Sequence, residues 1–181
     1  MTIISDVFAF AAQNADYWTE LLSGGDYPNE LTDEEIRALT AAREHVDSLV
    51  VEILHATGAK FATELGENKI AKKRFNGKNT AANRSNSLPA PSGLEGKLYR
   101  IEFSLWRNEA STAVELYASL VVKKSALDAL HQSLGERNVE HSVNGYEVYA
   151  KGLPIVANAD VNDLAARSAH QAVALLLGFD A

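Results

Sequence analysis

The stretch KLYRIEFSLW, residues 97–106, decides the fold because its residues alternate between apolar and polar types. Every second position is apolar: Tyr99, Ile101, Phe103 and Leu105. The positions between them are polar: Arg100, Glu102 and Ser104. A period of two is typical of a β-strand that buries one face. The stretch therefore predicts a strand whose apolar side chains contact a core.

Further strands follow, and together they predict two antiparallel hairpins. The turn RNEAS, residues 107–111, leads into a second alternating strand. Its inward positions are Val114, Leu116, Ala118, Leu120 and Val122. Further on, VEHSV (139–143) and YEVYA (146–150) flank Asn144-Gly145. This pair is the strongest turn signal in the chain, because both turn positions need a positive φ that Asn and Gly adopt at least cost.

Helices are predicted between and after the hairpins. A short helix begins at Ser125 and ends at Gly135, with Leu127, Leu130 and Leu134 facing inward. A last helix runs from about Asp160 to Leu177, where Gly178 stops it. The order hairpin, helix, hairpin, helix predicts an antiparallel sheet layer that needs helices on one face.

Two long acidic helices are predicted ahead of the strands. The first covers about residues 3–23, with an apolar stripe at spacings of three and four: Ile4, Phe8, Ala11, Ala15, Trp18 and Leu22. The second begins at a capping box in which Asp33, Glu34 and Glu35 follow Thr32. Its stripe continues to about Thr57, before a stop at Gly58: Ile36, Leu39, Val46, Val50 and Ile53. The fold class is therefore α+β.

The 181 residues fit a single domain with a sizeable core. We divide it into a helical part (1–65), a long basic and polar loop (66–95), and an antiparallel sheet with two helices (96–181). Thirty residues without periodicity are too many for an idle connection, so the loop is either functional or partly disordered. A short hairpin within it, between IAKKRF and KNTAA, would turn at Asn76-Gly77.

Charge is unevenly distributed along the chain, whose formal charge is −7. Residues 1–67 carry a net charge of −10, residues 68–107 of +7, and the remainder of −4. The sequence KIAKKRFNGKNTAANR, residues 69–84, holds six basic residues and no carboxylate; we call it the basic segment. Such a layout indicates that this segment contacts an anionic group: nucleic acid, an acidic face of a partner, or the protein's own acidic helices.

The basic segment therefore supplies the candidate binding residues: Lys69, Lys72, Lys73, Arg74, Phe75, Lys78 and Arg84. Lysine and arginine would neutralise phosphates or carboxylates, and Phe75 would stack on a base. Because the chain is acidic overall, we expect a nucleic-acid contact here to be local, or to need several copies around an oligomer.

No catalytic or cofactor motif stands out, and we expect no cofactor. The enzymatic alternative is a metal-dependent nuclease built on Glu95-x-Lys97, in which the carboxylate holds Mg²⁺ and the lysine helps to activate water. Glu64 or Glu67 would be the upstream acid. A second metal-like pattern is the pair Glu52 and His55 on one helical face.

These features favour a non-catalytic binding or regulatory protein that acts through protein–protein contacts, including self-association into a homo-oligomer. An alternative is an acidic inhibitor that occupies the nucleic-acid-binding surface of a host or phage defence enzyme. The chain has no cysteine, no apolar run near the roughly 20 residues of a membrane span, and no signal-peptide pattern. We therefore expect a soluble cytoplasmic protein that does not contact membranes.

Overall fold

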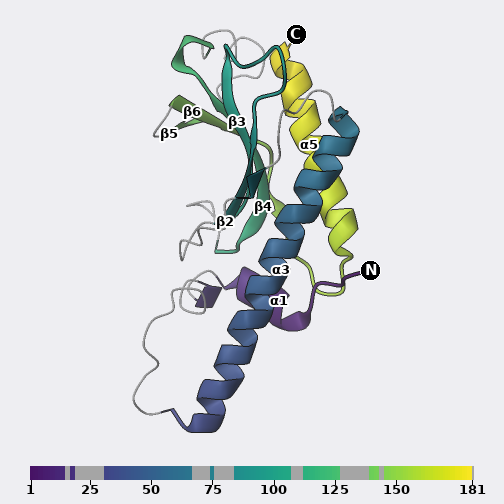
Figure 1. Ribbon diagram of the computed structural model, residues 1–181. Coiled ribbons are helices and arrows are strands. Elements are labelled where there is room, and N and C mark those ends of the chain that lie inside the picture. The colour runs from purple at the N-terminus through teal and green to yellow at the C-terminus, as the bar shows by residue number, and fades with distance from the viewer. Residues whose placement is uncertain are drawn as a thin grey trace.

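The computed structural model describes residues 1–14, 17–18, 31–66, 74–75, 84–106, 112–126, 139–142 and 145–180. The predicted α+β class is confirmed: N-terminal helices, an antiparallel sheet and a C-terminal helix are all present. Two long helices, α3 (Asp33–Leu65) and α5 (Val161–Asp180), run side by side and cover one face of the sheet (Figure 1). None of the described helices combines the length and apolar character that a membrane span requires.

Helix α3 begins where the sequence predicts and continues further than predicted. The capping box at its start is present, since Thr32 Oγ1 accepts from the Glu35 backbone N–H and Glu35 Oε2 accepts from the Thr32 N–H. The predicted stop at Gly58 is wrong. The helix continues for another seven residues because Phe61 is fully buried and packs its ring against Phe103, with 5.6 Å between ring centroids. Burial of this turn outweighs the low helix propensity of one glycine.

The first half of α3 differs from its second half in burial. From Val46 onward the predicted stripe is in the core, where Val46, Val50 and Ile53 are at most 1% exposed. Ile36 and Leu39, earlier in the same stripe, are only half-buried. In Figure 1 the start of α3 projects beyond the sheet and α5, which explains why its stripe has less to pack against.

The first predicted helix is shorter than expected. Helix α1 (Asp6–Gln13) begins after Ser5, whose hydroxyl accepts from the Phe8 N–H, and Asn14 leaves the helical conformation at its end. The stripe prediction is nevertheless confirmed for its described members, Ile4, Phe8, Ala11 and Trp18, all at most 2% exposed. The other two members, Ala15 and Leu22, lie outside the described residues.

The sheet is antiparallel throughout, with the strand order β1-β2-β3-β4-β6-β5 and with β7 also paired to β4. Its strands are β1 (Arg74–Phe75), β2 (Arg84–Pro89), β3 (Leu98–Trp106), β4 (Glu115–Val122), β5 (Val139–Ser142), β6 (Gly145–Tyr149) and β7 (Leu153–Pro154). The inward faces of β3 and β4 match the prediction with one exception, Tyr99, which is 46% exposed. An irregularity in the pairing with β4 between Leu98 and Arg100 turns Leu98 inward instead.

The predicted loop 66–95 contains a strand that the sequence pattern missed. Strand β2 pairs with β3 along its whole length, and β1 pairs with β2 through Arg74 with Ser87 and Phe75 with Asn86. In this register Phe75 lies opposite Asn86. The turn predicted at Asn76-Gly77 itself lies outside the described residues. Residues 67–73 and 76–83 lie outside the described residues.

The hairpin of β5 and β6 is confirmed, but its turn lies one residue earlier than predicted. Ser142 pairs with Gly145, so the two connecting residues are Val143 and Asn144 rather than Asn144 and Gly145. Gly145 serves a different purpose, because a Cβ there would lie 2.2 Å from the Val122 carbonyl oxygen. The glycine therefore allows β6 to approach the end of β4 closely.

The last helix confirms the predicted start and extends past the predicted stop. Asp160 Oδ1 accepts from the backbone N–H groups of Asn162 and Asp163, which caps α5. The helix passes through Gly178 to Asp180. Of the short helix predicted from Ser125 to Gly135, the described residues show a 3₁₀ turn, η2 (Lys124–Ala126). The remainder, residues 127–138, lies outside the described part of the chain.

Candidate binding surface

Part of the basic segment is built into the sheet. Arg74 and Phe75 form β1, and Arg84 is the first residue of β2. The other four candidate residues, Lys69, Lys72, Lys73 and Lys78, lie outside the described residues. The backbone of the basic segment is therefore paired, through β1, to the β2 edge of the sheet.

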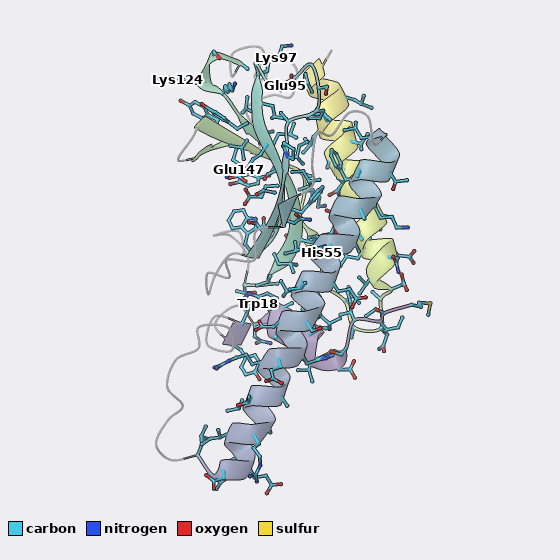
Figure 2. All side chains as sticks on the ribbon, in the orientation of Figure 1. Trp18, His55, Glu95, Lys97, Lys124 and Glu147 are labelled. Atoms are coloured by element: carbon cyan, nitrogen blue, oxygen red, sulfur yellow. The ribbon has the colours of Figure 1, made fainter. Side chains whose placement is uncertain are left out.

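Next to this edge lies the face of the sheet that points away from α3 and α5, which we call the outer face. The alternation of β3, β4 and β6 assigns nine polar and aromatic residues to it: Arg100, Glu102, Ser104, Trp106, Glu115, Tyr117, Ser119, Glu147 and Tyr149. In Figure 2 the labelled Glu147 lies on the side of the sheet away from both helices. One row of paired positions starts at Arg74 in β1 and crosses this face through Ser87, Glu102, Ser119 and Tyr149.

Hydrogen bonds connect the polar residues of the outer face. Arg100 Nε donates to Glu102 Oε2 at 2.7 Å, and Ser87 Oγ donates to the same oxygen at 3.4 Å. Ser119 Oγ donates to Glu147 Oε1 at 2.6 Å. These contacts hold one carboxylate on β3 and one on β6, the strands on either side of β4, over the same face.

Glu147 is the carboxyl group of this face with a raised pKa. Burial raises its pKa because the ionised form loses hydration, and the nearby Glu102 carboxylate raises it further. The hydrogen bond from Ser119 opposes both effects. The ionised form of Glu147 is therefore held at a cost to the folded state.

Three aromatic rings form a cluster on the outer face. The ring of Trp106 lies 5.0 Å from that of Tyr117 and 5.4 Å from that of Tyr149, measured between centroids. Tyr117 is 5% exposed and donates its hydroxyl to Glu115 Oε2 at 2.7 Å. A Cβ at Gly152 would lie 2.1 Å from that carboxylate oxygen, so only glycine fits beneath the pair.

The outer face is acidic where it is described. Glu102, Glu115 and Glu147 supply three carboxylates, and Arg100 supplies one guanidinium. This balance favours a cation over a phosphate, because like charges brought together in a partly desolvated site repel each other. Aromatic rings beside carboxylates are also the surroundings that ammonium and guanidinium groups prefer.

The nuclease residues occupy a different place. Glu95 and Lys97 are exposed in the turn before β3, near one end of the sheet (Figure 2). Glu95 Oε2 accepts from the Gly93 N–H at 2.8 Å, and Glu64 at the end of α3 contacts His170 Nδ1 of α5 at 2.8 Å. Glu67 lies outside the described residues. The described contacts thus join Glu95 to the Gly93 backbone and Glu64 to His170.

The other metal-like pattern is on the surface of α3, where Glu52 and His55 are both exposed. Within the described part of the chain, no three histidine, aspartate or glutamate side chains lie close enough together to hold a metal ion.

The outer face is a candidate surface that sequence reasoning did not identify. The alternation in residues 97–106 predicted that Arg100, Glu102 and Ser104 share one face of a strand, and no role was assigned to them. The aromatic cluster had no local signal, because Trp106, Tyr117 and Tyr149 lie on three different strands. Comparison of the chain with protein-family models, curated protein sequences and solved structures finds no match.

Proposed function

We propose that this chain is a non-catalytic binding protein whose basic segment holds an anionic partner at the edge of the sheet. One observation carries the proposal: β1, inside that segment, pairs in register with β2, through Arg74 with Ser87 and Phe75 with Asn86. Because Arg74 and Phe75 are paired to the sheet, the segment is joined to it at a defined position, which favours a specific contact over a solvated loop.

An acidic protein surface fits this position better than nucleic acid does. A nucleic acid lying across the β2 edge would meet the outer face, which carries three carboxylates and one guanidinium. Its phosphates would be repelled there, so the contact would be confined to the basic segment. An acidic protein surface has no evenly spaced phosphates and can be shaped to avoid the carboxylates.

The test compares masses by light scattering at about 50 and about 300 mM salt, because an ionic contact weakens with screening. Each sample is measured with and without a mixed pool of short DNA and RNA. The test variant carries Lys72→Ala, Lys73→Ala and Arg74→Ala. The matched control removes three exposed basic residues elsewhere, Lys60, Lys151 and Arg167, also to alanine.

The proposal predicts a salt-sensitive assembly that the test variant loses and the control keeps. A nucleic-acid complex with the same dependence would support the basic segment as a binding site and make nucleic acid its partner. Identical behaviour of the two triple variants would contradict the proposal.

A further inference from the structure

We infer that the outer face is a second binding surface, which takes an arginine side chain of a basic partner protein. The inference is independent of the basic segment, because the residues that carry it lie on β3, β4 and β6. The site has two parts: the Glu115 carboxylate, and the aromatic cluster of Trp106, Tyr117 and Tyr149. The planar guanidinium of arginine can contact a ring and a carboxylate at once.

The register of β3 with β4 brings the carboxylate and the indole ring together. Trp106 lies directly opposite Glu115, and side chains at opposite positions share one face with Cβ atoms about 4.5–5.5 Å apart. Trp106 and Tyr149 are half-buried, and their ring centroids lie 5.4 Å apart. A guanidinium over the indole ring is therefore within reach of Glu115. It gains a cation–π interaction and a charge-assisted hydrogen bond in the same position.

Contacts within the chain hold this carboxylate in place. Glu115 Oε2 accepts from the Tyr117 hydroxyl at 2.7 Å, and the Tyr117 ring lies 5.0 Å from that of Trp106. The backbone of Gly152 packs so closely on Glu115 and Tyr117 that a Cβ there would collide with both. Groups that are already fixed lose little conformational entropy when a partner binds.

The charges around this position favour a cation. Arg100 Nε and Glu102 Oε2 form an ion pair at 2.7 Å, so these two charges offset each other. Glu115 and Glu147 accept hydrogen bonds from a tyrosine and a serine hydroxyl, which donate a proton but supply no positive charge. A partner cation supplies that charge in a half-buried position, where water screens it less than at an exposed one.

Arginine of a protein partner fits these features better than other ligands do. A lysine ammonium is a compact, strongly hydrated charge that cannot stack on a ring as a guanidinium does. A phosphate would meet carboxylates of like charge. Within the described part of the chain, no three histidine, aspartate or glutamate side chains lie close enough together for a metal ion. Tryptophan, tyrosine and arginine are also the residues that dominate the binding energy of protein interfaces.

The experiment titrates the protein into a fluorescein-labelled synthetic peptide in which arginine alternates with glycine. Binding is followed by fluorescence anisotropy at about 50 mM salt, because screening weakens ionic contacts. Two peptides of the same length carry lysine, or citrulline as the uncharged analogue, in place of arginine. The test variants are Glu115→Gln, which keeps an acceptor for the Tyr117 hydroxyl, and Trp106→Leu. The matched control is Glu52→Gln, because Glu52 is an exposed glutamate on α3.

We expect the wild type to bind the arginine peptide about threefold more tightly than the lysine peptide, and the citrulline peptide least tightly. Glu115→Gln and Trp106→Leu each weaken binding of the arginine peptide by about threefold to tenfold. Glu52→Gln leaves this affinity unchanged. A further variant, Trp106→Phe, keeps a ring at the position and is expected to lose less affinity than Trp106→Leu, which separates loss of the ring from misfolding.

Three results would overturn the inference. The first is a wild type that does not bind the arginine peptide. The second is equal affinity for the arginine and lysine peptides together with equal losses in Glu115→Gln and Glu52→Gln, which would assign the binding to the overall negative charge. The third is wild-type affinity in Trp106→Leu, which would exclude the aromatic ring from the site.

Discussion

Single polar residues in the interior show how the sheet is fixed against the helices. Asn86 of β2 is fully buried, and its Nδ2 donates to the Leu54 carbonyl oxygen of α3 at 2.8 Å. The Leu54 carbonyl is within α3, so this bond joins a strand to the side of a helix. A buried polar contact of this kind favours one register of β2 under α3 over alternatives shifted by a residue.

Replacing Asn86 by alanine is expected to lower the free energy of unfolding by about 1–3 kcal/mol, because a buried hydrogen bond and its packing are lost. Urea unfolding measures the change. The control is Ser85→Ala on the neighbouring, half-buried position, which should stay within about 0.5 kcal/mol of the wild type. A loss at Asn86 no larger than at Ser85 would show that the contact contributes nothing to stability.

Glu147 gives a prediction about pH. Its pKa is raised in the folded state, so the folded protein holds this proton to a higher pH than the unfolded chain does. The stabilising effect is complete below the unfolded pKa and is lost as pH rises through the folded pKa. Glu147→Gln has no such proton, so its stability relative to the wild type should increase over that range.

Urea unfolding of both proteins between about pH 4 and about pH 8 measures the difference between their free energies of unfolding. The contributions of the carboxylates that both proteins share cancel in this difference. Glu102→Gln serves as the comparison, since it removes a carboxylate from the same face. A difference between wild type and Glu147→Gln that does not change with pH would contradict the assignment of a raised pKa to this residue.

At the scale of elements, local patterns predict where several elements begin, and contacts between segments decide features that no single segment encodes. The capping box at Thr32, the strand at 98–106 and the helix after Asp160 follow from neighbouring residues. Tyr99 points outward because of an irregular pairing with β4, which no single strand encodes. Asn144-Gly145 has strong turn propensity, yet Gly145 is needed for the close approach to Val122.

Strand β2 and the outer face also depend on contacts between segments. Strand β2 is rich in serine and asparagine and lacks apolar alternation, so its place in the sheet comes from pairing with β3. The outer face was predicted only as polar positions of one strand, and its aromatic cluster arises when three strands meet. The basic residues were identified from composition alone, and their pairing to the sheet through β1 was visible only in the structure.

The last turns of α3 supply a prediction at this scale. Phe61→Ala is expected to cost about 3–5 kcal/mol in unfolding free energy, because a fully buried ring that packs on Phe103 leaves a cavity. Lys60→Ala, at an exposed position one residue earlier, is the control. A cost below about 1 kcal/mol would mean that this part of α3 does not belong to the cooperative core.

At the scale of the whole molecule, charge and shape point to one account. Helices cover one face of the sheet (Figure 1), and the other face is acidic and aromatic beside an edge that carries the basic segment. An acidic protein retains this basic segment, in the account proposed here, because the segment holds an anionic partner at the edge of the sheet. The central claim is therefore an ionic contact between residues 69–84 and the acidic surface of a partner.

Light scattering of the triple alanine variant tests that claim most directly, because it removes Lys72, Lys73 and Arg74 from the basic segment and leaves the rest of the chain unchanged. The variant, the wild type and the control that lacks Lys60, Lys151 and Arg167 are measured at about 50 and about 300 mM salt. The account predicts an assembly at the lower salt concentration that the wild type and the control form and the test variant does not. Equal masses for the two triple variants at both salt concentrations would contradict it.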